Sequence, residues 1–168
     1  RNVATMVKAP KVIVARERLT FEQWREIYVY ANKHMQPWVP RMLVLALITG
    51  QRRSDLHKMR FSDVYDDLLH IEQAKTHEKI ALPLNLHHKI LPVRLGTAIN
   101  YCRVYAKAGE FLLRKHNGEP PKQSYMSSAF ETARDDALGK YTGEGFPPSL
   151  HECRSLAARL YEEAGINV

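Results

Sequence analysis

Apolar residues recur at helical spacing through most of this 168-residue chain. Residues 19–34 have an apolar stripe, and Thr20 followed three positions later by Gln23 forms a capping box, so a helix is predicted to begin at Thr20. Residues 41–48 are apolar on nearly all sides, which predicts a central, buried helix that ends at Gly50. Further helices are predicted over residues 52–59, 97–115, 124–138 and 150–164, the last one capped by Ser149.

The middle of the chain has a strand-like period of two. Residues 64–74 alternate imperfectly around a turn at Asp66 and Asp67, and residues 79–84 are a further strand candidate. The segment between these strands contains Lys75, which is therefore expected in or near a hairpin turn. The fold class predicted from these patterns is α+β, mainly helical, with a small antiparallel sheet.

We interpret the chain as one folded domain preceded by a short arm. Residues 1–15 have no helical stripe and contain Pro10, as is typical of an interdomain linker. Residues 16–168 hold the helix and strand patterns. Hydrophobic residues make up 45% of the chain and charged residues 26%, which is ordinary for a folded domain. There is no run of 18 apolar residues, so we expect no membrane partner.

Positive charge is concentrated in the first part of the chain. Residues 1–60 carry twelve Lys and Arg against four Asp and Glu, and the formal net charge of the whole chain is +7. Nucleic acid is the default partner of such a basic face, because neutralised phosphates release counterions. A generally basic protein with solvated lysines is the alternative.

The cysteines and histidines give little sign of metal or disulfide chemistry. Cys102 and Cys153 are far apart and follow no ligand spacing, which favours a reduced cytosolic setting. An H-E-x-x-H motif is absent, since Ser155 stands where the second histidine after His151 would be. We therefore expect no metal ion and no cofactor.

Arg52 is the first residue with candidate chemistry. It follows Gly50 closely and is expected in the first turn of a helix, where unpaired N–H groups favour an anion. Asp55 lies three positions on and is placed to hold the guanidinium group. An exposed Arg–Asp pair with no function is the alternative. Arg53 follows Arg52 directly, so only one of the two is expected to face a bound anion.

His151 and Arg154 repeat this arrangement on the last predicted helix. They are three positions apart and so share one helix face. A hydrogen-bond donor and a planar guanidinium group together suit a phosphate. The alternatives are a capping histidine with a solvated arginine, and, for Lys75, an ordinary exposed lysine.

Three stretches together resemble the catalytic domain of tyrosine recombinases, the phage integrase family, and most closely that of lambdoid phage integrases. They are ITGQRRSDLHKMRFSDV at 48–64, EQAKTHEKIALPL at 72–84 and HECRSLAARLYEEAG at 151–165. The resemblance covers roughly residues 16–168, nearly the whole chain, and it implies a mainly helical catalytic domain with a small antiparallel three-stranded sheet. Each motif is short, but their order and spacing agree.

The resemblance implies site-specific DNA recombination and phage genome integration without a metal. In this family a tyrosine attacks the scissile phosphate, forms a 3′-phosphotyrosine and releases a 5′-hydroxyl. Arg52 matches the first arginine of the family signature, and His151 and Arg154 match its H-x-x-R motif. Lys75 matches the hairpin lysine, and Asp55 matches the acidic residue that follows the first arginine. Cys153 stands where relatives commonly carry Leu, and we expect it to be buried and unreactive.

The family nucleophile has no counterpart among the tyrosines of this chain. The family places it downstream of H-x-x-R, whereas Tyr161 lies in the last helix at a core position. We therefore expect a catalytic-domain fragment, with its C-terminal part missing, that binds DNA without cutting it. Further backbone contacts to DNA are expected from Thr76, Lys79 and Lys122.

Other functions remain open at this point. A non-catalytic DNA-binding domain or directionality factor that keeps the fold is the main alternative, and a type IB topoisomerase-like enzyme or a generic basic helical domain are others. The expected partner is double-stranded DNA carrying attachment sites. The parent protein is expected to act as a tetramer on DNA in the cytoplasm of a bacterial host, and the fragment to be monomeric.

Overall fold

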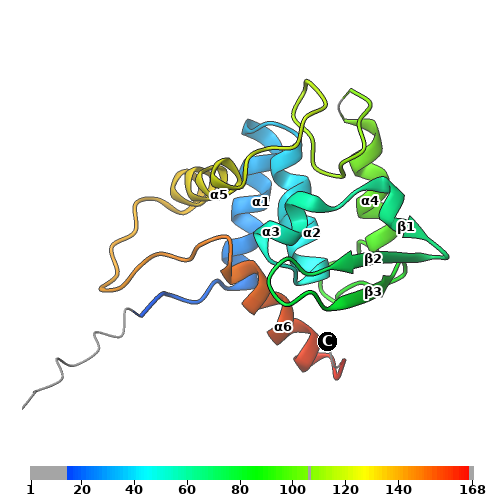
Figure 1. Ribbon diagram of the computed structural model, residues 1–168. Helices are drawn as coiled ribbons and strands as arrows, with labels where there is room; N and C mark the ends of the chain where they lie inside the picture. The colour runs from blue at the N-terminus through cyan, green and yellow to red at the C-terminus, as the bar shows by residue number, and fades with distance from the viewer. Residues whose placement is uncertain (1–14, 106, 167–168) are drawn as a thin grey trace, which may run out of the picture.

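The computed structural model describes residues 15–105 and 107–166, and in this part of the chain a small sheet lies at the edge of a group of helices (Figure 1). The helices are α1 (Phe21–His34), α2 (Trp38–Thr49), α3 (Arg53–Lys58), α4 (Leu95–Val104), α5 (Gln123–Leu138) and α6 (Glu152–Glu163), with a short 3₁₀ turn at Phe61–Asp63. The strands are β1 (Val64–Tyr65), β2 (Leu68–Glu72) and β3 (Lys79–Pro83), in the order β1-β2-β3 and antiparallel throughout. The predicted α+β, mainly helical class is confirmed. The proposed arm, residues 1–15, lies almost wholly outside the described residues.

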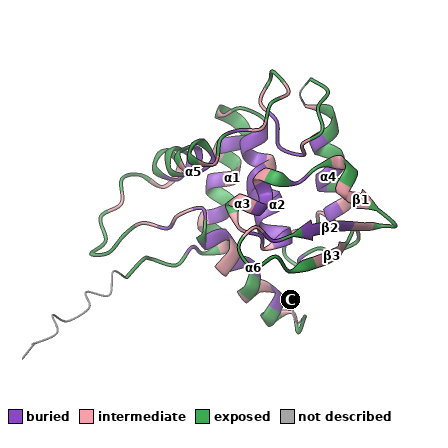
Figure 2. Cartoon of the chain, in the orientation of Figure 1, coloured by how far each residue is buried: buried purple, intermediate pink, exposed green. Residues whose placement is uncertain are grey.

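Helix α2 is the centre of the fold. Every residue of α2 except Arg41 is buried, and α1, α4 and α6 all pack against it (Figure 2). This confirms the prediction of a central helix from its apolar sequence. Each fully buried large apolar side chain contributes about 1.5–3 kcal/mol, so the position of α2 is strongly determined.

Local signals explain where α1 and the first hairpin form. The Thr20 side chain accepts from the Gln23 backbone and the Gln23 side chain accepts from the Thr20 backbone, which confirms the predicted capping box. The β1–β2 turn is made by Asp66 and Asp67, with φ angles of 53° and 57°. Both angles are left-handed, as a two-residue hairpin turn requires.

The predicted helix over residues 97–115 is wrong in its second half, because α4 ends at Val104. The cause is Arg114, which is 1% exposed and whose guanidinium group donates to the carbonyls of Cys102 at 2.8 Å and Phe111 at 2.7 Å. A buried guanidinium group needs such partners, and carbonyls at the end of a helix are free to accept. The segment after α4 therefore folds around Arg114 and does not continue the helix.

Helix α6 also begins differently from the prediction. Ser149 is not its side-chain cap: the residue at the N-cap is His151, without a side-chain cap hydrogen bond. Ser149 contributes its backbone carbonyl, which accepts from Glu152 N at 2.9 Å. Among the helices of the described residues, none is long and apolar enough to cross a membrane.

Asp67→Gly is expected to stabilise the domain. Asp67 holds a left-handed backbone angle that glycine adopts without strain, so the free energy of unfolding is expected to rise by about 1 kcal/mol. Urea unfolding of the 168-residue chain measures this. Glu131→Gly, at an exposed position inside α5, is the control and is expected to lower the free energy by about 1 kcal/mol. A loss of stability in Asp67→Gly would contradict the prediction.

Candidate phosphate-binding site

The site lies where the corner between α2 and α3, the β2–β3 turn and the start of α6 meet (Figure 1). The corner is sharp because Gly50 adopts a left-handed φ of 61° at the end of α2. A Cβ atom on Gly50 would lie 3.6 Å from Cβ of Ala157, so α6 packs directly against this corner. Three segments that are distant in sequence are thereby brought together.

Arg52 is the N-cap residue of α3, one position before the helical turn in which it was predicted. Its side chain is half-buried, and Nη1 donates to Oε1 of Gln73 at 3.3 Å. The predicted contact with Asp55 is wrong. The Asp55 carboxylate is buried, and its Oδ1 accepts instead from the backbone N–H of Ala74 at 2.8 Å. Asp55 thus attaches α3 to the β2–β3 turn.

Arg154 lies beside the same corner. Its Nη1 donates to the carbonyl oxygen of Gly50 at 2.9 Å. Burial lowers the pKa of the Arg154 guanidinium group, the positive charge of Arg52 lowers it further, and the negative charge of Asp55 raises it. Both arginines and one carboxylate therefore act on the same region, and Arg154 keeps its charge because a guanidinium group does not deprotonate in proteins.

His151 and Arg52 line one hollow of about 380 Å³ on the surface. Gln123 and Ser127 of α5 form another part of its wall. Arg53 also lines it, but its Nη1 donates to Oγ of Ser127, so this guanidinium group already has a protein partner. The hollow is open to solvent and lined by donors, as an anion site requires.

The β2–β3 turn carries Lys75 with its side chain exposed. Two backbone hydrogen bonds of Gln73, both 2.9 Å long, close the turn. The N–H of Gln73 donates to the carbonyl of Glu78, and the carbonyl of Gln73 accepts from the N–H of His77. Thr76 Oγ1 also donates to Gln73 Oε1 at 2.9 Å. Lys75 therefore projects from a turn whose base is bound to the Arg52 side chain through Gln73.

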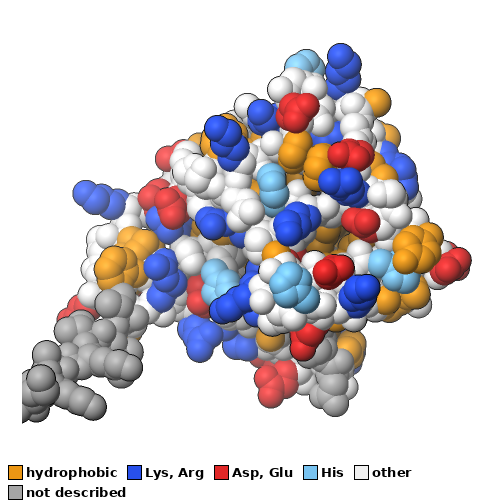
Figure 3. All heavy atoms as spheres, in the orientation of Figure 1, with side chains coloured by type: hydrophobic (Ala, Val, Ile, Leu, Met, Phe, Trp, Pro, Cys, Tyr) orange, Lys and Arg blue, Asp and Glu red, His pale blue; other side chains and the backbone are white. Residues whose placement is uncertain are grey.

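Two further residues predicted to contact DNA, Lys79 and Lys122, are exposed near the site. Lys79 is exposed at the start of β3, paired across the sheet with Glu72. Lys122 is exposed at the N-cap of α5, next to Gln123 of the hollow. Figure 3 shows Lys, Arg and His side chains gathered over α3, the β2–β3 turn and the start of α6.

Gln51 and Gln73 were not among the predicted site residues. Both are buried, and Nε2 of Gln73 donates to Oε1 of Gln51 at 3.0 Å, which joins the corner to the turn. A signal was present for Gln73: it continues the inward-facing positions of Leu69 and Ile71, so a polar side chain stands at a buried position directly after β2. Such a residue needs a buried partner.

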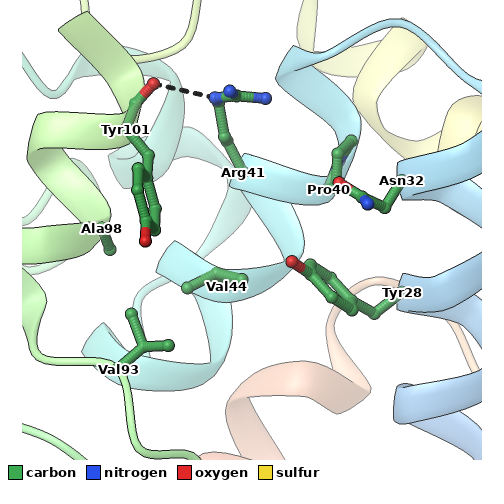
Figure 4. A pocket seen from close by; sticks show the side chains of 8 residues that line it. All are labelled: Tyr28, Asn32, Pro40, Arg41, Val44, Val93, Ala98 and Tyr101. Atoms are coloured by element: carbon green, nitrogen blue, oxygen red, sulfur yellow. Dashed lines mark hydrogen bonds between the residues drawn. The ribbon is translucent and has the colours of Figure 1, made fainter. Parts of the chain in front are cut away.

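A second hollow, of about 300 Å³, lies between α1, α2 and α4 (Figure 4). It contains Arg41, but the guanidinium group of Arg41 donates to the carbonyls of Tyr101 and Pro37 and lies over the Tyr105 ring. Its charge therefore serves packing, and none of the predicted site residues lines this hollow. Within the described part of the chain, no cluster of three His, Cys, Asp or Glu side chains could hold a metal ion.

In this helical domain Arg52 and His151 line one open hollow, and Arg154 is bound to the neighbouring Gly50, a set of donors that suits a phosphate. The chain matches the phage integrase family over residues 17–168 and belongs to that family. It is 36% identical to prophage integrase IntE of Escherichia coli K12 over 99% of the chain and 45% of IntE. It is also 36% identical to the integrase of Escherichia phage lambda, over 96% of the chain and 44% of the relative. The chain thus spans less than half the length of the curated relatives it matches.

The structure agrees with these relatives. The lambda integrase catalytic core superposes with a TM-score of 0.82 at 37% identity, covering 89% of this chain and 88% of the core. A lambda integrase dimer bound to a COC′ core site gives 0.87 at 36% identity, covering 95% and 57%. The XerA recombinase, at 11% identity and a TM-score of 0.63, shares the fold.

Asp55→Ala is expected to loosen the β2–β3 turn. The substitution removes the acceptor of the Ala74 N–H, so exchange of this amide with solvent should speed up and the free energy of unfolding should fall by about 1–3 kcal/mol. Amide hydrogen exchange and urea unfolding measure the two effects. Asp63→Ala is the control: Asp63 also accepts from a backbone N–H, that of Arg60, but in a hydrogen bond that is exposed to solvent. Unchanged Ala74 exchange in Asp55→Ala would rule out the anchoring role.

Proposed function

We propose that this chain is the catalytic domain of a longer site-specific tyrosine recombinase that integrates phage DNA, and that it binds the scissile phosphate. The supporting observation is the convergence of Arg52, Arg154 and His151 on the corner at the end of α2, with the Lys75 turn attached to the same corner. Membership of the phage integrase family supports the reaction class.

The residue types fit the parts of a phosphoryl transfer. Arg52 and Arg154 bind the non-bridging oxygens and stabilise the charge that develops on them in the transition state. His151 is exposed at the hollow and donates a hydrogen bond to the same phosphate or assists proton transfer. Lys75, on its exposed turn, protonates the leaving 5′-oxygen. Asp55 acts behind the arginines, as a buried negative charge that offsets theirs.

We further propose that the nucleophile is not one of the tyrosines of this chain. None of the eight lines the hollow that contains Arg52 and His151. Tyr161 is buried and its hydroxyl group donates to the carbonyl of Ile48 at 2.6 Å, so it cannot reach a phosphate at the surface. The full set is Tyr28, Tyr30, Tyr65, Tyr101, Tyr105, Tyr125, Tyr141 and Tyr161.

The partner that we propose is double-stranded DNA, with Thr76, Lys79 and Lys122 as contacts to its backbone. Solved lambda integrases include a dimer bound to a COC′ core site and a tetramer bound to a Holliday junction. By analogy, the full-length protein would form a tetramer on DNA, whereas this chain alone would be a monomer. The relatives come from bacteria and phages, which supports a reaction in the cytoplasm of a bacterial host.

Arg154→Ala in the full-length protein is expected to slow strand cleavage strongly while duplex DNA remains bound. Loss of a donor to the transition state lowers the cleavage rate by about 10²–10³-fold. Loss of one phosphate contact lowers the slope of log affinity against log salt by about 1. Covalent protein–DNA complexes on gels and fluorescence anisotropy at several salt concentrations measure these. Lys33→Ala, an exposed charge removed from α1, is the matched control.

The same experiment separates the enzyme from a non-catalytic DNA-binding or directionality factor. A binding factor would lose affinity in Arg154→Ala and would show no cleavage in any variant. The 168-residue chain alone is expected to bind duplex DNA without becoming attached to it. A covalent complex formed by this chain on nicked attachment-site DNA would contradict the proposal that the nucleophile lies elsewhere.

A further inference from the structure

The end of helix α2 has an unusual set of partners. The last carbonyl groups of a helix lack intrahelical donors, and here the helix ends inside the protein, where water cannot replace them. Four consecutive carbonyls at this end each accept from a side chain. The donors are His88 to Leu47 O at 2.7 Å, Tyr161 to Ile48 O at 2.6 Å, Gln51 to Thr49 O at 3.0 Å, and Arg154 to Gly50 O at 2.9 Å.

Helix α6 supplies two of these four donors. Arg154 and Tyr161 are seven residues apart, which is two helical turns, so they project from the same face. Between them Ala157 lies against Gly50. The face of α6 that carries Arg154 is therefore fixed to α2 at two separated points, and two points are needed to define how the helix is rotated.

We propose that Tyr161 is a positioning residue for the phosphate site, and that His88 supports it. This inference rests on the proposed function, because it assigns to Tyr161 the task of holding Arg154 against Arg52. The Arg154 guanidinium group already uses one N–H on Gly50 O, so a small rotation of α6 redirects all its other donors. The hydroxyl group of Tyr161, two turns of α6 after Arg154, prevents this rotation by donating a hydrogen bond to Ile48 O of α2.

The hydrogen bond of the Tyr161 hydroxyl group matters at this position in addition to the packing of its ring. A phenylalanine would fill the same volume, but it would leave the carbonyl of Ile48 buried and without its donor. Burial raises the pKa of the Tyr161 hydroxyl group, so it remains a neutral donor. The Tyr161 ring is also held, because the His88 ring lies against it with centroids 3.8 Å apart.

His88 has the properties of a fixed neutral donor. Its side chain is buried, and burial lowers the pKa of the imidazole. Nε2 lies 2.7 Å from the carbonyl oxygen of Leu47, which requires the proton on this nitrogen, while Nδ1 is buried with no hydrogen-bond partner. A side chain with one such donor and no charge could therefore replace it.

Tyr161→Phe is the central test. In the full-length protein the single-turnover cleavage rate on bound DNA is expected to fall by about 10–100-fold, because misplacement of a group that binds the transition state costs this much. DNA affinity is expected to stay within about twofold, since Arg52 and the exposed lysines still meet the backbone. Tyr65→Phe, at an exposed tyrosine stacked on His70, is the matched control and should change neither quantity. Wild-type cleavage rates in Tyr161→Phe would overturn the inference.

The two histidine variants test whether the polar contact matters. His88→Leu removes the donor to Leu47 O and is expected to slow cleavage as Tyr161→Phe does. His88→Gln restores an N–H donor of similar reach and is expected to recover most of the rate. Equal rates in the two variants would show that only packing matters and would overturn the supporting role of His88.

A measurement on the 168-residue chain tests the positioning directly, whatever the outcome for cleavage. The Nε–H resonance of Arg154 in NMR spectra is expected to be distinct in the wild type and to move toward the position of exposed arginines in Tyr161→Phe but not in Tyr65→Phe. An unchanged Arg154 resonance would overturn the positioning role of Tyr161 and leave the proposed function standing. If the wild-type full-length protein does not cleave DNA, or if Arg154→Ala cleaves normally, the proposed function fails instead.

Discussion

Helix α2 ends inside the protein, and its last carbonyl groups must find hydrogen-bond donors there. This need is met by side chains from the corner itself, from the segment before α4 and from α6. One of the donors is Arg154, which also belongs to the candidate site. The hydrogen bond from Arg154 therefore satisfies the buried helix end and also places a guanidinium group beside Arg52.

The electrostatics of the site follow from this arrangement. Two arginines held near each other repel, and the pKa of Arg154 is lowered by burial and by the charge of Arg52. The buried carboxylate of Asp55 offsets part of this charge, but it is bound to the backbone of the β2–β3 turn and not to either guanidinium group. Each guanidinium group thus keeps donors available, and an anion bound between the two would relieve the remaining repulsion.

Two errors in the sequence-based prediction share one cause, which is long-range contact by polar side chains. The helical pattern over 97–115 is real, but burial of Arg114 against the carbonyls that end α4 outweighs the local preference. The expected Arg52–Asp55 pair is plausible from spacing alone, yet Asp55 binds Ala74, nineteen positions away. Spacing along the chain predicts which side chains can meet within a helix, and it contains no information about partners on other segments.

The sequence by itself determined the class of fold, the central position of α2, the Asp66–Asp67 turn and the identity of the family, because each depends on short-range periodicity or on short motifs. Only the tertiary structure decided how the motifs meet. The structure shows that Gln51 and Gln73 join the α2–α3 corner to the Lys75 turn. It also shows that Tyr161 attaches α6 to α2. The physical reason is that the role of a buried donor depends on the carbonyl to which it donates, and that carbonyl lies far away in the sequence.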